Sequence, residues 1–180
     1  VLEINPQYVD AHNNLGVLLK QQGKYKEAAS CYARVLEINP QYVDAHNNLG
    51  VLLQQQGKYQ EALNSYNQAI KINSKYVEAY ANIGNILGSQ GNYSEAIKIF
   101  QKANKINPDY LTSHWLSMNT FPIIYQNIEE IEHYRNRFEE SINKINKLLD
   151  TKSNYTNKQI INALETSTNF YLHYQGKNTL

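Results

Sequence analysis

Residues 1–19 read VLEINPQYVDAHNNLGVLL, and residues 35–53 repeat the same letters in the same order. The identity resumes with QQGKY, at residues 21–25 and again at 55–59. The two copies are offset by 34 residues, and a third, diverged copy follows at the same offset over residues 77–110. A fixed period of this length indicates an array of stacked structural repeats.

Each copy predicts two helices joined by a short turn. Apolar residues recur at helical spacing on both sides of Gly23, which can adopt the left-handed conformation that ends a helix. Asn39 precedes Pro40 and is biased away from the helical region, so the second helix should end there. The six helices are expected over residues 9–22, 25–38, 43–56, 59–72, 77–90 and 93–106.

Small residues recur at one place in each type of helix. A glycine inside a helix costs about 1 kcal/mol relative to alanine, so its repetition predicts that the partner helix packs close to the backbone there. These residues are Gly16, Gly50 and Gly84 in the first helices, and Ala28, Ala62 and Ala96 in the second helices.

This spacing of small, aromatic and proline residues resembles the tetratricopeptide repeat. In the first copy it is carried by Leu15, Gly16, Gly23, Tyr25, Ala28, Tyr32, Val35 and Pro40. Later copies depart little: Ser74 stands in place of the proline, and Ile83 in place of the leucine. The resemblance covers residues 1–110 and implies an all-α, right-handed superhelix of helix hairpins with a helical C-terminal extension. It is specific for fold rather than for function.

The resemblance and the repeat period together predict how the chain is organised. Asn127 should cap a long helix that ends near Leu149, which either folds back as a capping helix or projects as a coiled-coil arm. The expected parts are a second-helix stub (1–8), three repeats (9–42, 43–76 and 77–110), a degenerate repeat with the long helix (111–150), and a linker, a short helix and the start of an omitted downstream domain (151–180).

Composition argues against several functional classes. The net charge is +1 and the basic residues are scattered, so neither nucleic acid nor an anionic membrane surface is an expected partner. We expect a cytoplasmic protein, because no apolar run approaches the length of a membrane span. The single cysteine, Cys31, excludes an internal disulfide and is interpreted as a small packing residue.

No catalytic, metal or cofactor site is expected. His12 and His46 share a place in the repeat but lack cysteine or clustered carboxylates, so packing is favoured over metal binding. His114, His133 and His173 are isolated in sequence. There is no glycine-rich phosphate loop, and an enzyme complete within these residues is the least favoured class.

The candidate binding residues lie on the polar side of the first helices, which should line the inner groove of the superhelix. Asn14, Asn48 and Asn82 share one register, and a carboxamide can both donate to and accept from a peptide group. The alternative is that these asparagines bond to neighbouring helices and only stabilise the stack. The predicted peptide-binding set is Asn13, Asn14, Gln21, Asn47, Asn48, Gln55, Asn82 and Asn85.

A narrower resemblance is to the O-linked N-acetylglucosamine transferase family, in which a tetratricopeptide array leads through a transitional segment to a catalytic region. It implies a substrate-recruiting arm whose asparagines hold a peptide backbone; the alternative is a stand-alone scaffold or adaptor. A carboxylate clamp of the chaperone-binding type is rejected, because Glu78 occupies one of its positions. Self-association through the apolar N-terminal seam is also expected.

Overall fold

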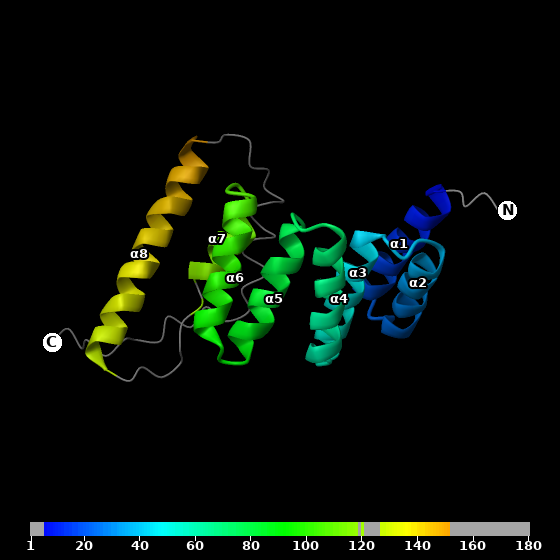
Figure 1. The fold of residues 1–180 in the computed structure, drawn as a ribbon, viewed down its shortest axis with the longest axis horizontal. Coiled ribbons are helices and arrows are strands. Elements are labelled where there is room, and N and C mark those ends of the chain that lie inside the picture. The colour runs from blue at the N-terminus through cyan, green and yellow to red at the C-terminus, as the bar shows by residue number, and fades with distance from the viewer. Residues whose placement is uncertain (1–5, 119, 121–126, 152–180) are drawn as a thin grey trace. The chain divides into compact units, whose positions relative to one another are not determined.

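The computed structural model describes residues 6–118, 120 and 127–151, and within these ranges the chain is all-helical. The linker, short helix and start of a downstream domain are expected over 151–180, and all of these residues except Thr151, which belongs to the last helix, lie outside the described residues. The helices are α1 (Pro6–Gln21), α2 (Tyr25–Ile38), α3 (Val43–Gln55), α4 (Tyr59–Ile72), α5 (Val77–Ser89), α6 (Tyr93–Ile106), α7 (Leu111–Met118) and α8 (Ile128–Thr151) (Figure 1). Consecutive helices form hairpins, so the predicted all-α repeat fold is confirmed.

Glycine ends the first helix of each hairpin, as the sequence predicts. Gly23, Gly57 and Gly91 have φ values of 75°, 76° and 81°. The backbone bonds around Gly23 are those of a Schellman turn: Gly23 N donates to Lys20 O at 3.0 Å, and Lys24 N donates to Leu19 O at 2.9 Å. The same pair of bonds recurs around the other two glycines.

Close approach explains the glycines inside the first helices. A Cβ placed on Gly16 would lie 2.5 Å from Cε1 of Tyr32, and one on Gly50 would lie 2.5 Å from Cε1 of Tyr66. Both tyrosines are fully buried. The missing side chain therefore makes room for an aromatic ring of the second helix, which is the packing reason that the sequence indicates.

The chain divides into two compact units, Val1–Ile86 and Leu87–Leu180, with the division inside α5. In the first unit α1 packs on α2, α3 packs on α4, and α3 also contacts both α1 and α2. Two clusters form the core between the first and second hairpins. One contains Ala28, Tyr32 and Leu52, and the other contains Val9, Val35 and Ala45.

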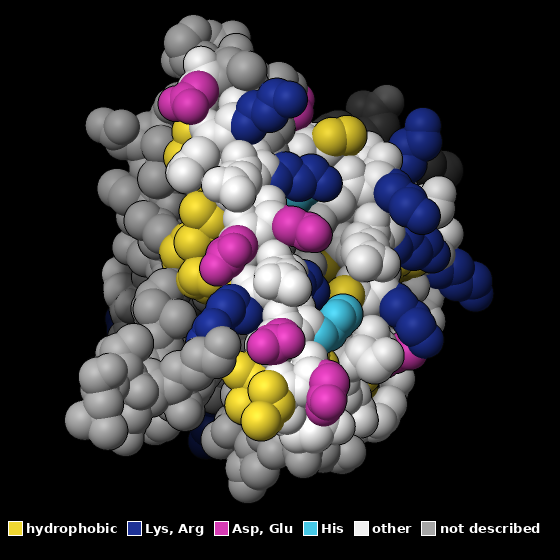
Figure 2. Space-filling view, turned by 90° about the vertical axis from the view of Figure 1, so that its left-hand side faces the viewer, with side chains coloured by type: hydrophobic (Ala, Val, Ile, Leu, Met, Phe, Trp, Pro, Cys, Tyr) yellow, Lys and Arg dark blue, Asp and Glu magenta, His cyan; other side chains and the backbone are white. Residues whose placement is uncertain are grey.

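In the second unit α7 packs against both α6 and α8. The predicted cap of the long helix is confirmed, because Asn127 Oδ1 accepts a hydrogen bond of 2.8 Å from Glu130 N. An Arg137 guanidinium nitrogen donates to the carbonyl of Thr120, which ties α8 to the residue just beyond α7. The side on which α8 lies carries acidic and basic side chains intermixed (Figure 2).

The start of α1 differs from the predicted stub over residues 1–8. Pro6, Gln7 and Tyr8 form the first turn of α1, whereas the same letters at 40–42 form the turn before α3. In that turn Asn39 donates its N–H to Val35 O and accepts from Gln41 N at its side chain and Tyr42 N at its carbonyl. Proline is also favourable in a first helical turn, where its missing N–H needs no partner, so the sequence NPQY permits both structures.

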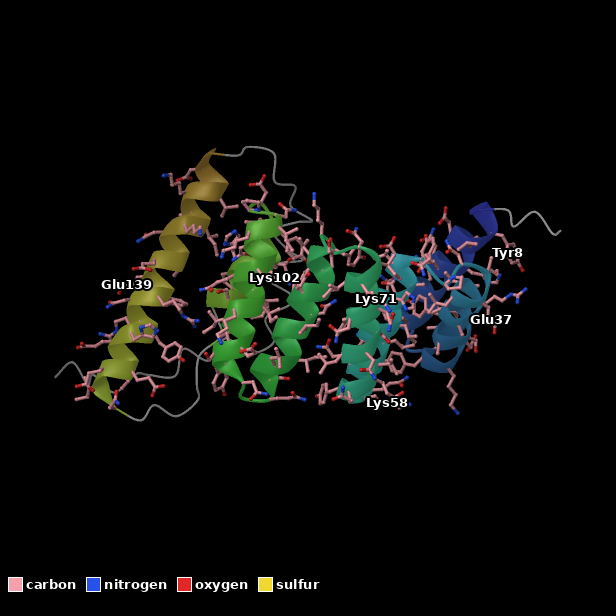
Figure 3. The ribbon with its side chains drawn as sticks, in the orientation of Figure 1. Tyr8, Glu37, Lys58, Lys71, Lys102 and Glu139 are labelled. Atoms are coloured by element: carbon pink, nitrogen blue, oxygen red, sulfur yellow. The ribbon has the colours of Figure 1, made fainter. Side chains whose placement is uncertain are left out.

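One face of α1 is apolar and uncovered. Tyr8, Leu15 and Leu18 are 55 %, 45 % and 54 % exposed, and Tyr8 projects from the N-terminal end of the helix (Figure 3). The sequence assigns Leu15 to a packing position. This position of a first helix is packed only where the second helix of the preceding hairpin contacts that helix, as α2 contacts α3.

Candidate functional site

The candidate site is the side of the first unit formed by α1, α3 and α5, which we call the first-helix face. Two hydrogen bonds between asparagine side chains join these helices in order. Asn48 Nδ2 on α3 donates to Asn13 Oδ1 on α1 at 3.0 Å, and Asn82 Nδ2 on α5 donates to Asn47 Oδ1 on α3 at 3.0 Å. The face is therefore held by amide pairs, each shared between successive repeats.

The two acceptor asparagines are more than nine-tenths buried. Asn13 is 7 % exposed and Asn47 is 8 % exposed, whereas Asn48 and Asn82 are half-buried. Within the described residues the Nδ2 groups of Asn13 and Asn47 have no acceptor, yet neither is among the polar atoms sealed from solvent. Each pair thus keeps one donor that still reaches the surface.

The predicted alternative, in which asparagines bond to neighbouring helices, holds for the Nδ2 groups of Asn48 and Asn82. Their Oδ1 atoms accept no hydrogen bond within the described part of the chain. Each can still accept from a ligand, so a structural role for one end of the amide does not remove a binding role for the other. Binding by these residues stays a prediction.

The remaining predicted residues are not brought into contact with one another. Asn14, Gln21 and Gln55 are exposed, and Asn85 is half-buried. None of these four makes a side-chain hydrogen bond within the described residues. They are free to meet a ligand, but the fold does not pre-position them as it does the paired amides.

Carboxylates mark the N-terminal end of the same face. Tyr42 OH donates to Asp10 Oδ1 at 2.5 Å, and Tyr76 OH donates to Asp44 Oδ1 at 2.7 Å. Burial, followed by the bond to Asp10 and the charges of Asp10 and Asp44, raises the pKa of Tyr42 to about 12. Tyr42 thus stays protonated at neutral pH, and each tyrosine hydroxyl holds one oxygen of its carboxylate partner.

Two histidines of one repeat register, His46 and His114, have a structural contact, whereas the Nε2 atom of His12 at the matching place is buried without a partner among the described residues. His46 Nε2 lies 2.9 Å from the carbonyl of Pro40, and Tyr80 OH donates at 3.2 Å to the carbonyl of Ser74, the matching residue one repeat later. His114 repeats the contact in the second unit, with Nε2 2.9 Å from the carbonyl of Pro108. His114 therefore belongs to the same register as His12 and His46, and its offset from them in multiples of the repeat period was the signal that the sequence reasoning missed.

The described residues offer little support for metal binding, for a reactive thiol or for a membrane span. The described residues contain no group of three or more histidine, cysteine, aspartate or glutamate side chains that could hold a metal ion. Burial, followed by the charge of Glu27, raises the pKa of the Cys31 thiol and so disfavours the reactive thiolate. Within the ranges that the structure describes, no helix combines the length and apolarity that a membrane span requires.

Several solved structures share this fold. A crystal structure of MamA matches with a TM-score of 0.66 at 20 % identity, covering 83 % of this chain and 85 % of that one. A mutant of Thermobaculum terrenum O-GlcNAc transferase matches with a TM-score of 0.63 at 21 % identity, covering 70 % of this chain and 25 % of that one. The first tetratricopeptide domain of Spaghetti (RPAP3), bound to an HSP90 peptide, matches with a TM-score of 0.56 at 20 % identity, covering 76 % and 98 %.

Sequence comparison supplies the family. No curated protein sequence matches the chain significantly. The profile of the tetratricopeptide repeat matches residues 7–75 and, in an overlapping placement, residues 45–108. These matches span the three hairpins from α1 to α6, including the glycine turns and the close contacts described above. This chain is a member of the tetratricopeptide repeat family, whose repeats form protein-interaction modules.

Proposed function

We propose that this chain binds an extended segment of another protein along the first-helix face. The observation that carries the proposal is the amide pairing: two nearly buried asparagines keep solvent-reaching donors, and their half-buried partners keep unused acceptors. Peptide groups need both kinds of partner, and they need them whatever the ligand sequence. The RPAP3 domain, which shares the fold, is bound to a peptide in its solved structure. We do not propose that this chain binds the same peptide.

A peptide selection on the whole chain tests the proposal. A random library of extended peptides is selected against immobilised protein, and the affinity of an enriched peptide is then measured by calorimetry. Replacing the exposed, unbonded Asn14, Gln21 and Gln55 together with alanine should weaken binding and leave the melting temperature nearly unchanged. Alanine at Asn67 and Gln68, exposed on α4, is the matched control. Failure to enrich any peptide would count against the proposal.

The carboxylate clamp of chaperone-binding domains is not part of the proposal. Asp10, Asp44 and Glu78 share one position along the first helices, and none of the predicted site residues is basic. A terminal carboxylate would meet like charge on this face. A selected peptide should therefore bind at least as tightly with an amidated C-terminus as with a free one.

We further infer that the module recruits substrates for a larger glycosyltransferase-like protein and does not itself catalyse a reaction. The support is the resemblance of the asparagine-containing repeats, together with a shared fold over 70 % of this chain. The alternative is an adaptor with no attached enzyme. The full-length gene product decides between them, because transfer of sugar from a nucleotide sugar to a bound protein is expected only in the first case.

As a second proposal, the chain self-associates through the uncovered face of α1. We also propose that the protein is cytoplasmic. It is supported by the exposed apolar side chains of Tyr8, Leu15 and Leu18. Replacing both leucines with lysine should convert a concentration-dependent oligomer into a monomer in light scattering. A wild-type chain that is monomeric at high concentration would overturn it.

A further inference from the structure

We infer that the apolar stripe along α8 is a docking surface for a later segment of the same chain, residues 157–166. This segment reads NKQIINALET and lies outside the described residues. The contact is independent of the proposed peptide binding, because the paired asparagines lie in the first unit and α8 lies in the second. The structure describes one partner of the contact, α8, and the sequence describes the other.

The stripe runs along the whole of α8 and is not sealed from water. Its positions alternate intervals of three and four residues, and they are Ile128, Ile131, Arg135, Phe138, Ile142, Ile145 and Leu149. Ile128 is 67 % exposed, and the other five apolar side chains are half-buried. Figure 2 shows hydrophobic side chains along one edge of the face on which α8 lies. The helix therefore presents a line of apolar surface that is only partly covered.

Helix α7 is too short to cover this stripe. Among the described helices of the second unit, α7 is the one that packs against α8. It has eight residues, whereas α8 has 24. At a rise of 1.5 Å per residue, the two helices are about 12 Å and about 36 Å long, so about two-thirds of α8 extends beyond α7.

A second copy of α8 does not suit the stripe. In a parallel pair, Arg135 would meet the same residue of the other helix inside the apolar line. In an antiparallel pair, Glu132 and Glu139, which flank the line and are exposed, would meet the glutamates of the other helix. Juxtaposed like charges disfavour association, so the occupant should have a different pattern of charge.

Residues 157–166 have the pattern and the connection that the stripe requires. Ile160, Ile161 and Leu164 are spaced so that they share one face of a helix. The segment follows α8 after only five residues, 152–156, which is a usual length for a connection between packed helices. So short a tether also gives the segment an effective concentration of the order of millimolar, which favours it over a separate partner.

The charges of the two helices match if the segment folds back antiparallel to α8. With a turn over 152–156, Lys158 comes level with Asp150, and Glu165 comes level with Lys144. Asp150 and Lys144 are both exposed, so each can meet an opposite charge. Exposed ion pairs add little to affinity, but they fix the direction and register in which the apolar faces meet.

Carbodiimide cross-linking of the whole chain tests the contact without any substitution. The reagent joins a lysine to a neighbouring carboxylate as an amide, and the product expected here links Lys144 to Glu165. Mass spectrometry of a mixture of isotope-labelled and unlabelled chains identifies the linked peptides. The amide should form within one chain. A link between a labelled and an unlabelled chain, or no link between these two residues, overturns the inference.

Hydrogen exchange gives a second measurement. Ile161→Asp with Leu164→Asp should raise the exchange rates of the backbone amides over 142–149 by about tenfold or more, because the apolar contact is lost. The control, Asn162→Asp with Thr166→Asp, adds the same charge on the opposite face of the expected helix. It should keep these rates within about twofold of the wild type.

Equal exchange rates in the test and control variants would contradict docking on α8. Affinity for a library-selected peptide should be the same in both variants and in the wild type, because the first-helix face is not involved. Peptide binding and docking on α8 can therefore fail separately. A wild-type chain that enriches no peptide overturns the proposed function and leaves the cross-link and the exchange rates to decide the docking.

Discussion

Helices α1 and α3 carry the same residues from Val9 to Leu19 and from Val43 to Leu53, yet they are packed differently. Leu18 is 54 % exposed, whereas its counterpart Leu52 is 1 % exposed. Leu52 lies in a cluster with Ala28 and Tyr32 of α2, the second helix of the preceding hairpin. No described helix plays that part for α1.

The asparagines show the same contrast. Asn48 donates to Asn13 on the preceding first helix, whereas Asn14, which has the same neighbours in sequence, is exposed and unbonded. The difference teaches that a residue in this array acquires its role from the hairpin in front of it. Such nearest-neighbour coupling is characteristic of repeat proteins, whose stability is roughly a sum over repeats and the interfaces between them.

The largest expected difference is between the two leucines. Leu52→Ala should lower the free energy of unfolding by about 2–5 kcal/mol, because it leaves a cavity beside Tyr32. In the monomer, at low protein concentration, Leu18→Ala should change it by less than about 0.5 kcal/mol, because about half of the side chain is already in water. Urea unfolding followed by circular dichroism measures both. Equal losses at the two positions would mean that α1 is covered in solution, as self-association predicts.

The second largest expected effect is a loss of folding stability at alkaline pH, which comes from the buried tyrosines. Burial, followed by the charge of Cys31, raises the pKa of Tyr32 to about 12. Between pH 10 and 12 the unfolded chain loses this proton and the folded chain keeps it, so stability present below pH 10 should fall as pH rises. The slope for a fully buried tyrosine is up to about 1.4 kcal/mol per pH unit.

The unfolding midpoint between pH 8 and 12 measures this slope. Tyr42 has a similarly raised pKa, and Tyr42→Phe should flatten part of the dependence. The control is Tyr8→Phe at the matching place, where the side chain is 55 % exposed. A pH dependence unchanged in the Tyr42 variant would contradict the assignment.

The hydroxyls of Tyr32 and Tyr66 provide a smaller contrast. Tyr66 OH donates to Gln54 Oε1 at 2.8 Å, whereas Tyr32 OH is buried without a partner among the described residues, because Lys20 stands where the next repeat has Gln54. Burial also lowers the pKa of Lys20. Lys20→Gln should therefore raise stability by about 1 kcal/mol, and Gln54→Lys should lower it by about 1–2 kcal/mol. Thermal melts at neutral pH measure both changes. A loss of stability in the Lys20 variant, together with a gain in the Gln54 variant, would show that the glutamine is not the acceptor of the tyrosine hydroxyl.

The smallest expected effect is the difference in stability cost between replacing a hydrogen-bonded asparagine and replacing an unbonded one. Asn48→Ala should cost about 0.5–1.5 kcal/mol, since it removes the hydrogen bond to Asn13, and Asn14→Ala should cost nearly nothing. The comparison uses the same substitution at neighbouring places in the repeat, with denaturant midpoints as the measurement. A silent Asn48 variant would mean that the amide pair contributes no net stability and serves ligands alone.

Much of the fold could be predicted from local signals. The glycine turns, the ends of α2 and the Asn127 cap depend on backbone preferences of a few adjacent residues, so the sequence places them within one or two positions. The close contact at Gly16 was predicted from its recurrence, although the ring that fills the space, Tyr32, was identified only by the structure. The start of α1 at Pro6 was missed, because the same NPQY sequence is compatible with a turn and with a first helical turn.

The candidate site was only half predictable. The sequence identified the amide register, but which atom of each amide is used in the stack depends on helices one period apart. Asn13 and Asn47 were included only as members of a polar face, and their near-complete burial gave no local signal. His114 was within reach of sequence reasoning, because it stands two periods after His46.

The sequence alone determined the hairpin, its period and its family, because turn residues and helical periodicity act over a few positions and recur in every copy. Only the tertiary structure decided which leucine is buried, which amide is paired and where the first helix begins. The physical reason is that burial and hydrogen bonding between repeats belong to the interface with the preceding hairpin. Two identical segments therefore acquire different roles when only one of them has such a neighbour.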